Sequence, residues 1–129
     1  MSRYCFKVYH YNTNRICKIS AFTLLNKDGS LTRGEQEGLL IFGGGTVCDD
    51  NFSTNSANAI CRELGFAAAA QWRSGVNWGS IQTSKPVNLD NVVCSEGGSW
   101  SSCTYSEISN CFHEEDIFLT CQGTICTKL

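Results

Sequence analysis

Nine cysteines in a chain of 129 residues constrain the fold more than any other feature of the sequence. Reducing compartments rarely maintain such a density unless the thiols bind metal. Zinc sites usually combine closely spaced cysteine pairs with each other or with histidines. Here the closest pair is Cys121 and Cys126, and only His10 and His113 could complete a site. The pattern therefore predicts disulfides and a secreted or extracellular protein.

The length suits one domain and is too short for two ordinary hydrophobic cores. In a domain this small, cross-links supplement a modest core, each typically by about 2–4 kcal/mol. No segment approaches the roughly 20 apolar residues of a membrane helix, and Phe66–Ala70 is far too short. The N-terminus lacks the pattern of a signal peptide, so we expect a mature or recombinant form, and we expect no membrane span in this sequence.

Hydrophobic patterning predicts an α+β domain in which strands outnumber helices. The clearest helix covers residues 56–64, where Ala57, Ile60, Cys61 and Leu64 share one face, with Thr54 or Asn55 as N-cap and Gly65 as the stop. Extended segments are expected at residues 5–11, 16–25, 39–42, 46–48, 87–93 and 117–121. The glycines at 43–45 predict a tight hairpin between two of these strands.

Several motifs, in the order they occur, carry a resemblance to a known family. They are Gly45–Asp50, Ala57–Phe66, Leu89–Cys94, Trp100–Cys103, and the acidic run before Cys121. Together they resemble a scavenger receptor cysteine-rich domain from about Phe22 to Cys121, which leaves residues 1–21 as an N-terminal extension and 122–129 as a tail. Motifs that agree in order are a specific signal.

The resemblance implies a curved, antiparallel-rich sheet that cradles one short helix. It also implies the disulfide pairs Cys48–Cys111, Cys61–Cys121 and Cys94–Cys103. Position 66 is Phe where one subgroup has a further cysteine, so the chain resembles the form with three core disulfides.

Three additional cysteines, Cys5, Cys17 and Cys126, lie outside the family pattern. A hairpin closed at residues 12–14 would place Cys17 opposite Tyr9, so Cys5 and Cys17 are not a natural cross-strand pair. We expect one of them to bond to Cys126 and the other to remain free or to link two chains into a homodimer.

Carboxylates on both sides of the implied Cys48–Cys111 bond suggest a cation site. The family resemblance places Ca²⁺ or Mg²⁺ among Asp49, Asp50 and Glu115, and carboxylate oxygens suit both ions. A second, weaker family site would use Asp90 and Asn110. The alternative is that the acids are solvated or paired with Arg62 or Lys85. Asn51-Phe52-Ser53 is also an N-glycosylation acceptor pattern.

The expected function is extracellular recognition of polyanionic, microbial or cell-surface ligands, assisted by the cation. The alternative is a structural or accessory module that contacts another protein or forms disulfide-linked oligomers, as the odd cysteine count suggests. No nucleophile motif such as G-x-S-x-G is present, so we expect no enzyme activity of this chain. Nothing in the sequence points specifically to nucleic acid. Residues 1–48 carry six basic against three acidic side chains, which could add long-range attraction for anions.

Overall fold

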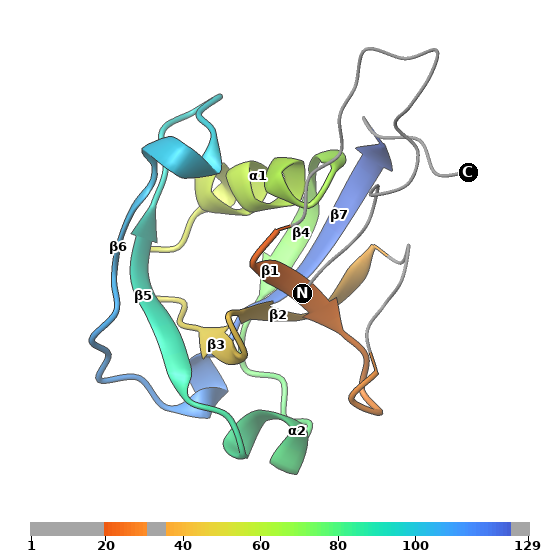
Figure 1. Cartoon of the computed structure of the whole chain (residues 1–129), viewed down its shortest axis with the longest axis vertical. Helices are drawn as coiled ribbons and strands as arrows, with labels where there is room; N and C mark the ends of the chain where they lie inside the picture. The colour runs from red at the N-terminus through yellow and green to blue at the C-terminus, as the bar shows by residue number, and fades with distance from the viewer. Residues whose placement is uncertain (1–19, 31–35, 125–129) are drawn as a thin grey trace.

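The computed structural model describes residues 20–30 and 36–124 (Figure 1). Cys5, Cys17 and Cys126 lie outside these residues, as do the strand expected at 5–11 and the start of the one expected at 16–25. Their pairing, the homodimer and the domain boundaries at residues 21 and 122 therefore stay predictions.

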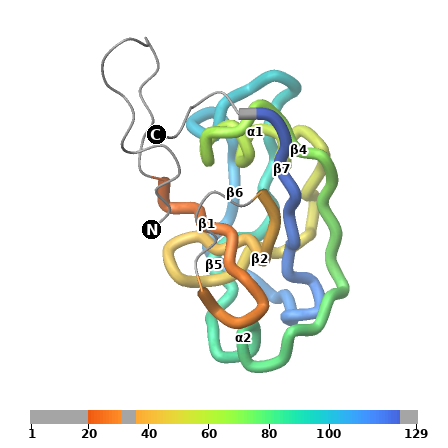
Figure 2. The backbone as a smooth tube through the Cα atoms, turned by 90° about the vertical axis from the view of Figure 1, so that its right-hand side faces the viewer, coloured from red at the N-terminus to blue at the C-terminus, as the bar shows by residue number. Residues whose placement is uncertain are grey.

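Seven strands form one curled sheet, in the order β4-β7-β2-β3-β5-β6 with β1 paired to β2. Every pair is antiparallel except β3 with β5, so the sheet is mixed. Figures 1 and 2 show β4 and β7 side by side, with α1 lying across their end. The strands are β1 (Phe22–Leu25), β2 (Glu37–Phe42), β3 (Gly45–Val47), β4 (Phe66–Arg73), β5 (Val87–Val93), β6 (Thr104–Ser106) and β7 (Phe118–Thr124).

The expected glycine hairpin is confirmed. Phe42 pairs with Gly45, and Gly43 and Gly44 make the two-residue turn with φ of 59° and 91°. Positive φ at both turn residues suits glycine and matches the twist of the strands. Beyond the turn, Val47 pairs with Leu89 in parallel fashion. This pairing sets the residues after β3 beside the middle of β5.

The helix expected at residues 56–64 is α1 (Thr54–Glu63). It begins after Ser53, whose side chain accepts a hydrogen bond from the Ser56 backbone, so neither Thr54 nor Asn55 is the cap. Ala57, Ile60 and other residues of its apolar face are fully buried. A ten-residue helix is marginal alone, and this one is stabilised by packing chiefly against β4.

Several elements were not anticipated from the sequence. The strand β4 is alanine-rich and pairs with β7, while β6 is only three residues long. The short helices are α2 (Ser80–Thr83) and the 3₁₀ turns η1 (Trp100–Ser102) and η2 (His113–Glu115).

Two apolar clusters lie on opposite faces of the sheet. The main core is shared by α1 and the inner face, and Trp100 packs against its edge. The smaller cluster on the outer face contains Leu39 and Phe118, with Trp78 packed over it. The Trp78 and Phe118 rings meet edge to face with centroids 4.7 Å apart. Part of the 74–81 segment thus covers the outer face.

The implied disulfides are confirmed. Cys61–Cys121 ties α1 to β7, Cys94–Cys103 closes the loop between β5 and β6, and Cys48–Cys111 joins the segment after β3 to the segment before η2. Within the described ranges, no helix has the length and hydrophobicity needed to cross a bilayer.

Candidate cation site

Four carboxylates gather around the Cys48–Cys111 disulfide, and we call them the acid cluster: Asp49, Asp50, Asp90 and Glu115. Asp49 and Asp50 follow β3 directly, Asp90 lies within β5, and Glu115 ends η2. The parallel pairing of β3 with β5 supplies Asp90, and an antiparallel bridge between Cys48 and Asp116 supplies Glu115. Segments distant in sequence thus meet at one place.

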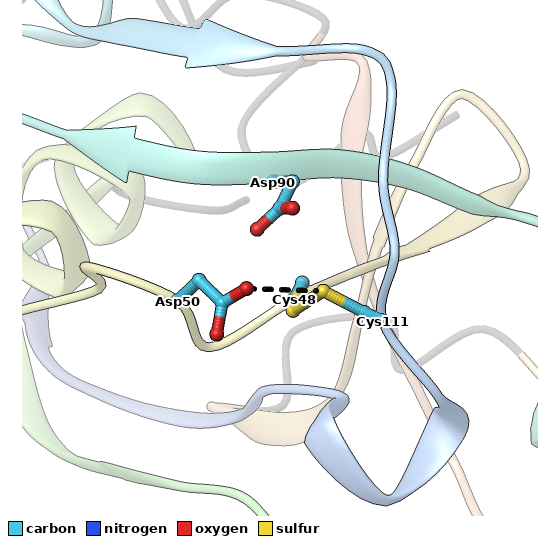
Figure 3. A group of neighbouring side chains, drawn as sticks. All are labelled: Cys48, Asp50, Asp90 and Cys111. Atoms are coloured by element: carbon cyan, nitrogen blue, oxygen red, sulfur yellow. Dashed lines mark hydrogen bonds between the residues drawn. A yellow bond between two sulfur atoms is a disulfide. The ribbon is translucent and has the colours of Figure 1, made fainter.

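Asp50 is the centre of the cluster. One set of ligand atoms, all within 4.8 Å of one another, comes from Asp49, Asp50 and Glu115 together with Cys48. A second set joins Asp50 and Asp90 to the disulfide. Figure 3 shows Asp50 and Asp90 directed toward the same space beside the two sulfurs. One Asp50 oxygen lies 3.5 Å from Sγ of Cys111, a contact only, since a disulfide sulfur carries no proton.

Hydrogen bonds hold three of the four carboxylates in place. Oδ2 of Asp49 accepts from the Ser74 hydroxyl at 2.7 Å, and Oε1 of Glu115 accepts from the Phe112 backbone at 3.0 Å. Oδ1 of Asp90 accepts from the Asn91 backbone at 2.8 Å, and Asp90 is only 3% exposed. Each of these bonds uses one carboxylate oxygen and orients the other.

The cluster concentrates negative charge. Desolvation raises the pKa of Asp50, and the neighbouring carboxylates of Asp90, Glu115 and Asp49 raise it further. Among the described residues, no lysine or arginine forms an ion pair with the cluster. Arg62 instead donates to the Gly98 carbonyl, and Lys85 to the Ile81 carbonyl. The alternative in which these two cations neutralise the acids is therefore wrong.

The donor set fits Ca²⁺. Oxygens that bind one Ca²⁺ at about 2.3–2.6 Å lie at most about 5 Å apart, and one oxygen each from Asp49, Asp50 and Glu115 lie within 4.8 Å of one another. Bonds to Mg²⁺ of about 2.0–2.1 Å hold their oxygens within about 4 Å of one another, a closer approach than Ca²⁺ requires. The disulfide sulfurs are not available as thiolate ligands.

Three further residues were predicted as site residues: Asp90 and Asn110 for a second cation site and Asn51 for glycosylation. Asp90 joins Asp50, whereas Asn110 is an exposed residue next to Cys111, and a second site with Asn110 stays a prediction. Asn51 is also exposed, and its side chain donates to Oδ1 of Asn91 at 2.7 Å. Glycosylation of Asn51 likewise stays a prediction.

A buried polar network supports η2 behind the cluster. Nδ1 of His113 lies 2.9 Å from Oδ2 of Asp116, and Nε2 of Gln82 donates to the same oxygen at 2.9 Å. Gln82 also donates to the His113 carbonyl and accepts from the Trp78 backbone. Sequence reasoning noticed His113 but missed Gln82, for which short-range sequence patterns offered no signal. The network fixes the turn that carries Glu115.

Comparison with known proteins agrees with this architecture. The sequence model of the scavenger receptor cysteine-rich domain family matches residues 33–122 of this chain. The third such domain of murine neurotrypsin is 32% identical, with a TM-score of 0.57 over 78% of this chain and 95% of that chain. The dimeric form of the domain from mouse MARCO is 33% identical, with a TM-score of 0.51 over 60% of this chain and 74% of that one.

Relatives among full-length proteins match over a smaller part. Human lysyl oxidase homolog 4 is 41% identical and human lysyl oxidase homolog 2 is 36% identical, each over 80 residues. The match covers 60% of this chain and 10% of each relative. Domains of the matched kind are generally extracellular modules for recognition or protein contact and are not themselves catalytic. The matched length and the neighbouring folds lead to one conclusion: this chain belongs to the scavenger receptor cysteine-rich domain family.

Proposed function

We propose that this domain recognises anionic ligands outside the cell by means of Ca²⁺ held in the acid cluster. The observation that carries the proposal is the convergence of four carboxylates that have no basic partner among the described residues. Like charges brought together in a fold repel one another, so an arrangement that retains them favours a cation. Extracellular fluid supplies Ca²⁺, and oxygen ligands are those it prefers.

The four carboxylates of the acid cluster have different roles in binding Ca²⁺. Asp50 belongs to both ligand sets, so the site depends on it most. Ser74 and the Phe112 backbone hold Asp49 and Glu115, so that little side-chain entropy is lost when their free oxygens bind. Asp90 contributes charge from the buried side. When bound, Ca²⁺ supplies a positive centre to which an anionic group of the ligand attaches.

The ligand class follows from this chemistry. A ligand with several anionic groups, on a polymer, a microbial surface, a cell surface or a partner protein, gains from repeated attachment. The three carboxylates of one ligand set leave part of the usual six to eight coordination positions to water and ligand. We therefore expect weak Ca²⁺ affinity, with a Kd on the order of 10⁻⁴–10⁻³ M as in other extracellular modules.

Replacing Asp50 by asparagine should abolish Ca²⁺ binding, because it removes the charge common to both ligand sets. Calorimetric titration of Ca²⁺ into the disulfide-bonded chain is the measurement. As a second readout, Ca²⁺ at ten times its Kd should raise the free energy of unfolding of the wild type by about 1.4 kcal/mol. The Asp50→Asn variant should show no such rise.

Glu114→Gln is the matched control, since Glu114 is exposed, adjacent to Glu115 and outside both ligand sets. It removes the same charge and should leave the Kd for Ca²⁺ within about twofold of the wild-type value. That factor corresponds to a difference of about 0.4 kcal/mol in the free energy of binding. In chelator, Asp50→Asn should unfold no more readily than the wild type, because the raised pKa of Asp50 means that its neighbours disfavour the ionised form. Equal Ca²⁺ binding by Asp50→Asn and the wild type would contradict the proposal.

A further inference from the structure

A hollow of about 220 Å³ lies on the outer face of the sheet, above β7 and beside Trp78. Its lining includes two cations, one carboxylate, three neutral polar side chains and an indole: Lys27, Arg73, Glu37, Asn26, Gln71, Thr120 and Trp78. It shares no residue with the acid cluster. Pockets for drug-sized ligands are larger, at about 300–1,000 Å³, so this one has room for a single ring or terminal group.

The register of β4, β7 and β2 determines which side chains form the floor of the hollow. Thr120 of β7 pairs with Gln71 on one side and Glu37 on the other, which gives a polar row across three strands. In the next row on the same face, Phe118 pairs with Arg73. Adjacent strands are about 4.8 Å apart, so the row from Gln71 to Glu37 spans roughly 10 Å. That width suits one sugar ring with its substituents.

The two cations of the hollow are available for a ligand. Neither Lys27 nor Arg73 has an ion pair or a side-chain hydrogen bond with any residue that the structure describes. Asp28, the acid next to Lys27, is already engaged, because its Oδ1 accepts from the backbone and hydroxyl of Ser30 at 2.9 and 2.7 Å. These bonds also lower the pKa of Asp28 and order the turn that presents Lys27.

Trp78 supplies an aromatic wall. Its ring rests edge to face on Phe118, while its backbone N–H donates to Gln82, so its position is fixed from two sides. Trp78 is only partly buried, and it lines the hollow. An indole that is anchored and partly exposed offers an apolar face together with an N–H donor.

We propose that this hollow binds a carboxylated sugar, a ring that carries a carboxylate such as a uronic acid, without the help of a cation. The ring would lie against Trp78, and its carboxylate would take paired hydrogen bonds from Arg73 with support from Lys27. Glu37, Gln71 and Thr120 offer acceptors and donors to the hydroxyl groups. A simple inorganic anion would gain nothing from the indole and has no hydroxyl groups for the polar row to contact. This site goes beyond the proposed cation-dependent function and is independent of it.

The test is an NMR titration of the whole disulfide-bonded chain in chelator with methyl β-glucuronide. The uncharged methyl β-glucoside, which has the same ring without the carboxylate, is the matched ligand. The indole N–H resonance of Trp78, assigned with Trp78→Phe, should shift to saturation with the glucuronide. The glucoside should bind at least tenfold more weakly, because it lacks the charged partner of Arg73.

The variant Arg73→Gln should weaken glucuronide binding at least tenfold. Lys85→Gln is the matched control, since it removes one positive charge outside the hollow, and its binding should stay within twofold of the wild type. Equal losses in the two variants would show general charge attraction and overturn the site, as would equal binding of the two sugars. Glucuronide binding that requires Ca²⁺ would also overturn it while favouring the acid cluster, so the two proposals fail separately.

Discussion

Replacing both cysteines of the Cys61–Cys121 bond by alanine should lower the free energy of unfolding by about 4 kcal/mol, the largest change that we expect. The bond spans 60 residues and ties α1 to β7. Loss of so long a cross-link releases much conformational entropy in the unfolded chain. Both cysteines are buried in the main core, so lost packing adds to the effect.

The matched comparison is the Cys94–Cys103 bond, whose cysteines are only 9 residues apart. Its removal should cost about 2.5 kcal/mol on the same entropic model. Urea unfolding of the wild type and of both double variants, followed by circular dichroism, measures the difference. Equal losses for the two pairs, or a larger loss for the short loop, would show that chain entropy does not set the contribution of these bonds.

The variant Asp116→Ala should lower the free energy of unfolding by about 3 kcal/mol, because it leaves a buried polar network without its acceptor. Asp116 is 1% exposed, and its carboxylate contacts both His113 and Gln82. Gln82 is 2% exposed, so water cannot readily replace the lost partner of its amide.

Asp116→Asn is the control for shape, since its amide oxygen can still accept from Gln82. We expect a loss of about 1 kcal/mol, the typical value of a single hydrogen bond. Chemical denaturation of the two variants under identical conditions makes the comparison. If Asp116→Ala lowers the free energy of unfolding no more than Asp116→Asn does, the network does not support η2.

The main helix could be predicted because its apolar face has a local signature. Ala57, Ile60, Cys61 and Leu64 repeat at helical spacing, and all four are buried. Its first residue was less predictable. Ser53 and Ser56 form a reciprocal cap, but a serine at the third helical position lacks the length of the usual Glu or Gln, so the pattern was not apparent.

The strand β4 could not be predicted from local sequence. Four alanines, Ala67–Ala70, follow its first residue, and alanine has low strand propensity. The segment is extended because it pairs with β7 and is covered by α1. Such tertiary stabilisation overrides local preference, and only the three-dimensional arrangement reveals it.

Only part of the candidate site could be predicted, because the rest depends on contacts between distant strands. The family resemblance implies the Cys48–Cys111 bond, which draws the acids beside the two cysteines together, and the same resemblance selects Glu115 to join Asp49 and Asp50. The role of Asp90 beside Asp50 depends on the parallel register of β3 and β5, in which Val47 pairs with Leu89. A parallel register between strands so far apart in sequence has no local turn to fix it, so only the family resemblance gave Asp90 a place, at a second site with Asn110.

The central claim is that ligand capture depends on Ca²⁺ in the acid cluster, and binding to immobilised poly-L-glutamate tests it most directly. This polyanion has carboxylates but no sugar ring, and any attachment of it to the hollow beside Trp78 would persist in chelator, so the part of the binding that needs Ca²⁺ reports on the acid cluster. The wild type and Glu114→Gln should bind in Ca²⁺ and be released by chelator, whereas Asp50→Asn should bind no better in Ca²⁺ than in chelator. Capture by the wild type that is unchanged in chelator would contradict the account.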